Sequence, residues 1–594
     1  MALKPDLVVA LAVCALSVPA TAQQTETLTA LEKRVERLQG DLEGIGSVRA
    51  IKRVQLAYGH YVEFGLWNDF ADLFTDDAIT NYQQGARGRE AVRRLFFDQV
   101  GQGKLGLSDG RIYPHILFQP VITLAPDGRT AKGRWRILAM LGGYGGSATW
   151  YSGVYENEYV LEGSAWKISV LHSEPKVTAV YTATGWKDSG VHVPFHYTAA
   201  SVTTPIPDSA SRGVKAAGKA HPSLASLADH VDQLSRRATL LNDQADVTNL
   251  QDTYGYAVDR KLWDQAADLF ARDGTLELGQ RGVYVGKASI RRAFDQFGSQ
   301  GLRGGERNDH VYLQTIVSVA PNGGTAKARG NELIMSSANG GELVEGVFEN
   351  SFIKQNGRWK IQSVHFYPRM IVDAATGWAK SAKPAPGPSE QFPPDRPPTI
   401  SYEIYPKFAV TPFHFDNPVT GKPPQYPERV LTAEKPTPAT APPPRGPAIR
   451  NSAALEARLA ELEHAINVAK AYDAAENLIG AYAYYLDESP SDMAGLFARA
   501  PRKKEDAPRS MAPEGTVLVN QILQPVIDIA ADGKSAKVRA RLLDLGGISG
   551  GRGYWTAGAF QGQFVSQHGS WRIESAGSTA VWSARYPGGW TRSP

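Results

Sequence analysis

Apolar residues recur along one side of the stretch from Leu250 to Phe270, which predicts a long amphipathic helix followed by a shorter one. The positions that lie four residues apart are Leu250, Tyr254, Val258 and Leu262. Within this frame an acid, Asp259, follows Tyr254 by five residues, and Trp263 follows the acid by four. The stretch therefore combines a helical core pattern with side chains capable of chemistry.

The same frame occurs two more times. Tyr58, Glu63 and Trp67 form an earlier copy, and Tyr482 and Asp487 form a later copy that has no Trp. Copies roughly 200 residues apart are too widely spaced for a solenoid, whose repeats are about 20 to 50 residues long. The chain of 594 residues is therefore predicted to hold three tandem domains of one kind, the third of them degenerate.

A stripe of apolar residues with steps of three and four precedes each copy, which suits a helix that packs one side on a partner. The stripes are Leu28, Leu31, Val35, Leu38 and Leu42; Leu224, Leu227, Val231 and Leu234; and Leu455, Leu459, Leu462 and Ile466. We expect each helix to lie on its own domain. A homo-oligomer formed through the N-terminal helices or through the sheets is the alternative.

The second half of each copy alternates apolar and polar residues around turn signals, which predicts antiparallel strands. The clearest turns fall at Gly128, Gly323 and Gly533. Helices followed by strands indicate an α+β domain, in which helices pack on one face of a curved, mostly antiparallel sheet. Such a sheet forms a cone, and its mouth is a natural apolar pocket.

These patterns divide the chain into three domains, 25–186, 224–380 and 451–594, separated by linkers at 187–223 and 381–450. The second linker is rich in Pro and should be extended. Each linker carries a related aromatic patch, Val193–Tyr197 and Thr411–Phe415. We expect these patches to be laid onto a domain surface as straps.

Residues 1–22 are predicted to be a cleaved secretory signal, since Lys4 precedes an apolar run that ends before Ala20-Thr21-Ala22. The mature chain would then be periplasmic or secreted, with no stable membrane insertion. Its only cysteine, Cys14, would leave with the signal, so no disulfide or thiol chemistry is expected. A net charge of +4 gives little support for a nucleic-acid partner, and we expect none.

With these elements in place, the residues resemble the SnoaL-like domain of the nuclear transport factor 2-like superfamily. The resemblance rests on Tyr254-x4-Asp259, the Trp four residues later, the Leu-Phe pair, the strand residue His310 and the final Trp-Lys-Ile strand. The nearest branch in pattern includes bile-acid 7-alpha-dehydratase and scytalone dehydratase, which the resemblance associates with a Tyr, an Asp and a His in the pocket. It implies an α+β cone that needs neither cofactor nor metal.

The resemblance implies a catalytic set in each of the first two copies, Tyr254, Asp259 and His310 in one and Tyr58, Glu63 and His115 in the other. Asn520 stands where the third copy would have its His. Further recurring residues are predicted to line the pocket: Trp263, Trp67, His365, His172, Asn350 and Asn157. Five residues on an ideal helix span about 140°, so Tyr254 and Asp259 share a pocket only if the helix bends or ends nearby.

Two classes of function stay open. An Asp and a His that face one small molecule can exchange a proton, as a dehydratase-like lyase or an isomerase requires. The substrate would be a small apolar or cyclic molecule. The alternative is a non-catalytic module that binds a small apolar ligand or assembles with partners, because this fold alone does not fix function. If there is chemistry, we expect it mainly in the second copy.

Overall fold

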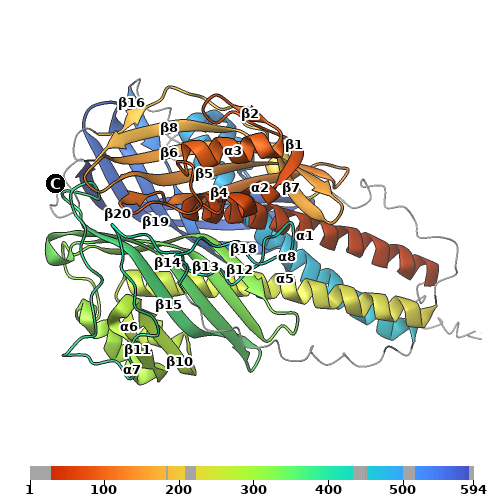
Figure 1. Ribbon diagram of the computed structural model, residues 1–594. Coiled ribbons are helices and arrows are strands. Elements are labelled where there is room, and N and C mark those ends of the chain that lie inside the picture. Colours follow the sequence, from red (N-terminus) through yellow and green to blue (C-terminus); the bar gives the residue numbers. More distant parts are fainter. Residues whose placement is uncertain are drawn as a thin grey trace, which may run out of the picture.

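The computed structural model describes residues 28–181, 185–207, 223–431, 449, 451–499 and 515–586. The predicted signal peptide, 1–22, lies outside these residues. The α+β class predicted from the sequence is confirmed, because three units each pair a long N-terminal helix with a mostly antiparallel sheet (Figure 1). We call these units domains 1, 2 and 3.

In domain 1, α1 (Leu28–Phe64) is followed by α2 (Trp67–Asp72) and α3 (Arg89–Gln99). Its strands are β1 (Phe74–Thr80), β2 (Ala86–Arg87), β3 (Arg111–Ile112), β4 (His115–Leu124), β5 (Thr130–Gly143), β6 (Ala148–Glu162), β7 (Ala165–Leu171), β8 (Ser173–Val180) and β9 (Lys187–Asp188). A short helix, α4 (Ala199–Val202), follows in the linker and is capped by Thr198.

Domain 2 repeats this plan with α5 (Leu224–Asp259), α6 (Trp263–Asp268) and α7 (Gly286–Phe294). Its strands are β10 (Phe270–Leu278), β11 (Val283–Val285), β12 (Asn308–Val319), β13 (Thr325–Ser336), β14 (Glu342–Gln355) and β15 (Arg358–Asp373). They lie in the order β11-β10-β15-β14-β13-β12, in which only the β10–β15 pair is parallel. The helices cover one face of this sheet, which makes the cone.

Domain 3 contains α8 (Ser452–Glu488) and α9 (Pro490–Met493). Its strands are β16 (Thr516–Val519), β17 (Ile522–Ile529), β18 (Ser535–Ile548), β19 (Gly553–Gln567) and β20 (Ser570–Tyr586). A counterpart of α3 and α7 would fall in a stretch that includes 500–514, which lies outside the described residues.

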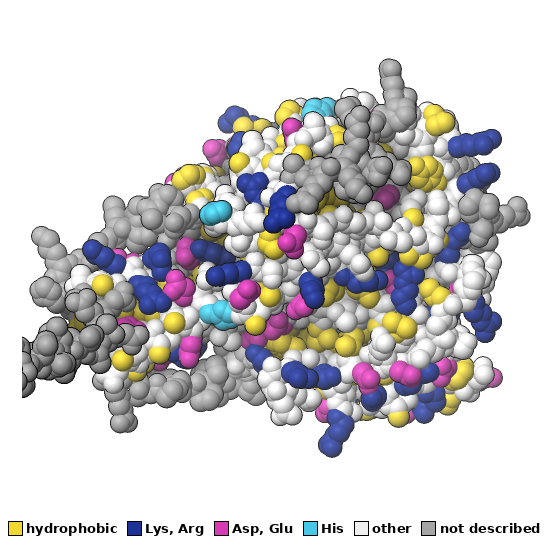
Figure 2. All heavy atoms as spheres, turned by 180° about the vertical axis from the view of Figure 1, so that it is seen from behind, with side chains coloured by type: hydrophobic (Ala, Val, Ile, Leu, Met, Phe, Trp, Pro, Cys, Tyr) yellow, Lys and Arg dark blue, Asp and Glu magenta, His cyan; other side chains and the backbone are white. Residues whose placement is uncertain are grey.

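The three long helices, α1, α5 and α8, pack side by side and project from the sheets as a bundle (Figure 1). Their apolar stripes form one shared core, in which Leu31, Val231 and Leu459 are fully buried. The expectation that each stripe lies on its own domain is therefore wrong, because the best available apolar surface is the other two stripes of the same chain. Side chains of both charge signs lie next to each other on the outside of the bundle (Figure 2).

A second shared core joins the sheets. Trp150, Trp186, Trp378 and Trp555 pack with ring centroids 5.0 to 5.4 Å apart in edge-to-face geometry. Trp186 and Trp378 come from the Gly-Trp pairs that close domains 1 and 2. The two shared cores, one of helices and one of sheets, make the three domains a single packed body.

Both aromatic patches of the linkers are laid on domain surfaces, as the strap interpretation predicted. Phe195 packs on Tyr485 of domain 3 and under the Arg134 guanidinium of domain 1. In the second linker, Phe413 packs on Phe64 of domain 1, and the centre of its ring lies 3.9 Å from the guanidinium carbon of Arg329 of domain 2. Each strap thus fastens a helix end of one domain to the sheet of another.

Candidate functional site

The cone of domain 1 holds a chain of hydrogen bonds between Tyr58, Tyr155 and His115. The Tyr155 hydroxyl lies 2.8 Å from His115 Nε2 and 3.2 Å from the Tyr58 hydroxyl. Burial lowers the pKa of His115 to about 3, so the imidazole is neutral at physiological pH. Burial also raises the pKa of both tyrosines well above their ordinary value, so both hydroxyls keep their protons.

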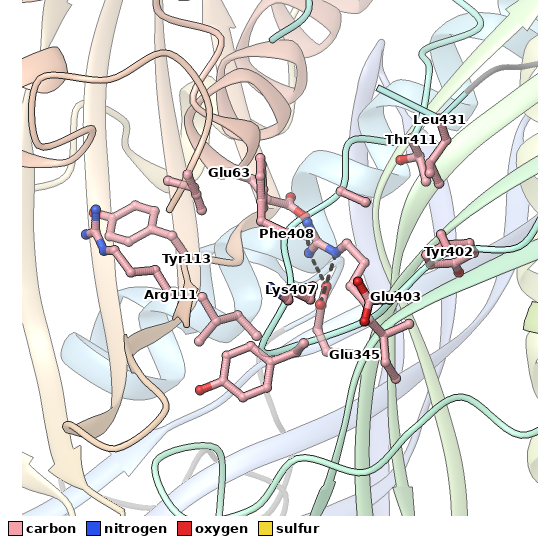
Figure 3. A pocket seen from close by; sticks show the side chains of 16 residues that line it. Glu63, Arg111, Tyr113, Glu345, Tyr402, Glu403, Lys407, Phe408, Thr411 and Leu431 are labelled. Atoms are coloured by element: carbon pink, nitrogen blue, oxygen red, sulfur yellow. Dashed lines mark hydrogen bonds and ion pairs between the residues drawn. The ribbon is translucent and has the colours of Figure 1, made fainter. Parts of the chain in front are cut away.

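The acid predicted for this cone, Glu63, does not face it. Its carboxylate accepts a hydrogen bond of 2.8 Å from Asn331 Nδ2 of domain 2 and forms an ion pair with Arg369. Arg369 also binds Glu345, with its Nε 3.1 Å from that carboxylate (Figure 3). Burial raises the pKa of Glu63 to about 7; Arg369 opposes this shift and Glu345 adds to it. Glu63 therefore belongs to the contact between domains 1 and 2, and its predicted grouping with Tyr58 and His115 is corrected.

The cone of domain 2 contains a histidine held by a carboxylate. His310 Nδ1 lies 2.6 Å from Glu332 Oε1, and both side chains are largely buried. Tyr254 and Tyr312 lie beside this pair, with ring centroids 6.2 Å apart, and Tyr312 shares a hydrogen bond with Glu332. Burial raises the pKa of both tyrosines well above the ordinary value, so each is a hydroxyl donor.

Asp259 is separated from this cluster. It accepts a hydrogen bond of 2.6 Å from the backbone N–H of His310, and it forms a buried ion pair with Arg541 of domain 3. The cause is geometric: α5 keeps its helical geometry up to Asp259, its last residue, so the five-residue step turns the acid about 140° away from Tyr254. The predicted trio is corrected to Tyr254 and His310 in the cone and Asp259 in the contact between domains 2 and 3.

The third copy repeats this relationship and closes a ring. Asp487 forms an ion pair with Arg136 of domain 1. One strand position recurs in the three sheets and is occupied by Arg136, Asn331 and Arg541. At this position the residue on the neighbouring strand is the one just before a glutamine at a β-bulge. The acid of each long helix therefore binds one structural position in the next domain, and at Asn331, which is uncharged, Arg369 supplies the cation.

The other predicted pocket residues hold the fold together. The Trp67 and Trp263 indoles donate to the carbonyls of Lys104 and Gly298, each at 2.9 Å. Asn157 and Asn350 tie a strand to a long helix by donating to Gln55 and Gln251, at 3.0 and 2.8 Å. These four side chains thus brace the cone.

The two histidines near the ends of the final strands also lie away from the clusters in the cones. His172 is 3.1 Å from Glu174 and is partly exposed. The His365 ring stacks on the Tyr367 ring, with centroids 3.8 Å apart. His365 also faces Glu277, whose carboxylate accepts a hydrogen bond from Thr399 of the linker. Their predicted place in the pocket is therefore corrected.

Sequence reasoning missed Glu332, Tyr312 and Tyr155. Glu332 and Tyr312 stand opposite each other on β13 and β12, a pairing that the register alone brings together. Strand alternation around the hairpin at Gly323 could have placed Tyr312 and His310 on one face, since they are two residues apart. Within the described part of the chain, no group of three His, Cys or acidic residues could hold a metal ion.

Two segments of the chain, residues 45–172 and 239–365, match the model of the SnoaL-like domain. The chain contains two SnoaL-like domains. The resemblance stated from the sequence is confirmed, and the matched segments fall in domains 1 and 2. No curated protein matches the chain. None of the described helices is long and apolar enough to cross a membrane.

Several solved structures are similar to a single SnoaL-like unit of this chain. A putative scytalone dehydratase from Novosphingobium aromaticivorans is 20% identical, with 25% of this chain and 98% of that chain covered and a TM-score of 0.22. The hexachlorocyclohexane dehydrochlorinase LinA-type3 from Novosphingobium barchaimii is 19% identical, with 26% and 99% covered and a TM-score of 0.22. An NTF2-like protein with a cystatin-like fold from Novosphingobium aromaticivorans is 17% identical, with 25% and 92% covered and a TM-score of 0.20.

Proposed function

We propose that the SnoaL-like domain 2 is a cofactor-independent lyase or isomerase centre with His310 as its base. The observation that carries the proposal is the 2.6 Å contact between His310 Nδ1 and Glu332 Oε1. A carboxylate that accepts the Nδ1 proton fixes the tautomer and leaves Nε2 as the basic nitrogen. It also stabilises the imidazolium that forms when Nε2 takes up a proton. Histidine held in this way is suited to general-base catalysis near neutral pH.

The surrounding residues fit removal of a proton next to a carbonyl, with departure of a hydroxyl in the case of a dehydratase. Tyr254 keeps its proton and can donate to an oxygen of the substrate, whereas the Tyr312 hydroxyl donates its proton to Glu332. The aromatic wall around them, which includes Phe270 and Phe348, favours a small apolar or cyclic substrate. Asp259 has a supporting role here, since its carboxylate accepts a hydrogen bond from the backbone N–H of His310.

The second candidate is non-catalytic binding of a small apolar ligand, and domain 1 favours it. His115 is neutral and bonded to a tyrosine in place of a carboxylate, so no group equivalent to Glu332 supports a charged imidazole there. Ile137 stands in β5 where Glu332 stands in β13. We therefore propose that domain 1 binds a small apolar ligand without converting it.

Export is part of the proposed function. Its support is the sequence pattern of Lys4, the apolar run and Ala20-Thr21-Ala22. N-terminal sequencing of the mature protein should begin at Gln23. A soluble cytoplasmic protein that keeps Met1 would contradict this.

The catalytic proposal is tested by screening small cyclic hydroxy-carbonyl compounds against the mature chain for thermal shift and then for turnover. With a substrate in hand, His310→Gln should lower kcat by about 10² to 10⁴-fold. His115→Gln is the matched control and should leave turnover nearly unchanged. If His310→Gln stays folded and keeps full turnover, the catalytic role of domain 2 is wrong and the binding role replaces it.

A further inference from the structure

An open pocket of about 310 Å³ lies between domains 2 and 3, outside both cones. The loop before β12 forms one side of it and the later part of β20 forms the other. The lining residues that matter here are Arg260, Leu302, Arg307, Asp309, Val581 and Trp582. Its size is at the lower end of the range of small-molecule sites.

The pocket is separate from the proposed catalytic cluster because successive strand residues face opposite sides of the sheet. His310 points to Glu332 in the cone. Its neighbour Asp309 points the other way, where it binds Arg541 at 3.0 Å and the indole N–H of Trp582. The argument for this pocket is therefore independent of any catalytic role of His310.

The corresponding place between domains 1 and 2 is nearly filled. There the lining includes Ile112, Tyr113 and Arg369, and the cavity is only about 30 Å³. Residues 402–408 of the linker cover it (Figure 3). Between domains 2 and 3, the lining residues that the structure describes belong to these two domains. The same architecture thus leaves an accessible site at one of these two contacts.

Two guanidinium groups line the pocket, and no carboxylate contacts them directly, although the charge of Asp309 acts on both from a distance. Arg307 is only 5% exposed, and its guanidinium lies 5.2 Å from the centre of the Trp582 ring. In the described part of the chain, no carboxylate oxygen lies within 4.0 Å of a guanidinium nitrogen of Arg307 or of Arg260. The two acids that line the pocket already have cations: Asp309 binds Arg541, and Glu306 binds Lys261.

Burying a guanidinium that no carboxylate contacts directly is costly, and an anion that enters the pocket and pairs with it would relieve that cost. We propose that this pocket binds a small organic carboxylate. The carboxylate group would lie between Arg307 and Arg260, since the planar guanidinium fork matches a carboxylate in shape. The apolar part of the ligand would rest on Leu302, Val581 and the edge of Trp582, which gives the site a preference for carboxylates with an apolar or aromatic body.

Benzoate is a suitable probe, and benzamide is its uncharged isostere. Isothermal titration of the full mature chain should detect benzoate, with benzamide binding at least about tenfold more weakly, because the amide cannot pair with two guanidinium groups. Arg307→Gln and Arg260→Gln should each weaken benzoate binding by about tenfold or more. Arg303→Gln, an exposed arginine of the same loop, is the matched control and should leave binding unchanged.

The position of the ligand gives a second measurement that does not depend on the variants folding. In crystals soaked with 4-bromobenzoate, the anomalous signal of bromine should lie near Trp582 and Val581. A signal only in the cone of domain 1 or domain 2 would overturn the proposal. So would equal affinity for benzoate and benzamide, unchanged affinity in both arginine variants, or the absence of any benzoate binding.

Discussion

Asp487 of domain 3 and Arg136 of domain 1 form an ion pair at 2.5 Å in which both side chains are fully buried. The pair joins domain 1 to domain 3, since Arg136 lies on β5 and Asp487 lies near the end of α8. Glu63 with Asn331 and Arg369, and Asp259 with Arg541, are the related contacts at the other two junctions. The acidic position of the repeated frame therefore connects the domains into a ring.

Asp259→Asn should mainly destabilise the contact between domains 2 and 3. The amide can still accept the His310 N–H, but it leaves Arg541 without one of its two carboxylates. Removing one partner of a buried pair costs about 3 to 5 kcal/mol, which urea unfolding followed by tryptophan fluorescence would detect. Asp264→Asn, which breaks an exposed pair with Arg291, is the control and should change little. Equal stability of the two variants would refute the connecting role of Asp259.

Glu332→Gln should separate positioning from binding in domain 2. The amide keeps the shape of the side chain but cannot stabilise a charged His310, so kcat should fall on the order of tenfold or more while KM stays nearly constant. A folded variant with unchanged kcat would show that Glu332 has only a structural role.

The stability of the protein should fall as pH rises from about 4.5 to about 7, through Glu63. The pKa of this carboxyl is about 7 in the fold and near 4.5 in the unfolded chain, because the fold buries it. In that window the folded state binds more protons than the unfolded state, so the free energy of unfolding decreases with rising pH. Glu63→Gln should remove this contribution and flatten the profile of melting temperature against pH. Identical profiles for the variant and the parent would contradict the shift.

Loss of one apolar side chain from the helix bundle should destabilise the whole chain. Leu31, Val231 and Leu459 come from three different helices and share one core. Leu31→Ala and Leu459→Ala should each lower the free energy of unfolding by about 2 to 5 kcal/mol. Lys33→Ala, on the exposed side of α1, is the control. If the two leucine variants melt domains 1 and 3 separately, the bundle is not a shared core.

The sequence by itself determined the repeated architecture. Periods of three and four residues predict α1, α5 and α8, and strict alternation around glycine turns predicts the hairpins, because both patterns reflect local geometry. The three copies of the Tyr-acid frame gave the number of domains. The aromatic patches in the linkers predicted straps, since Phe195 and Phe413 would be unfavourable in free solvent.

Only the tertiary structure decided how the domains use these residues. The sequence contained the 140° step between Tyr254 and Asp259, but not what lay on the far side of α5. That partner, Arg541, is almost 300 residues away, and only the packing of domain 3 brings it there. In the same way, Glu332 joins His310 through strand register, and the apolar stripes meet each other because folding places three distant helices side by side. Contacts between distant segments depend on packing that no local pattern encodes, which is why Tyr254 and His310 could be predicted from the repeated frame, whereas Glu332 and the partner of Asp259 could not.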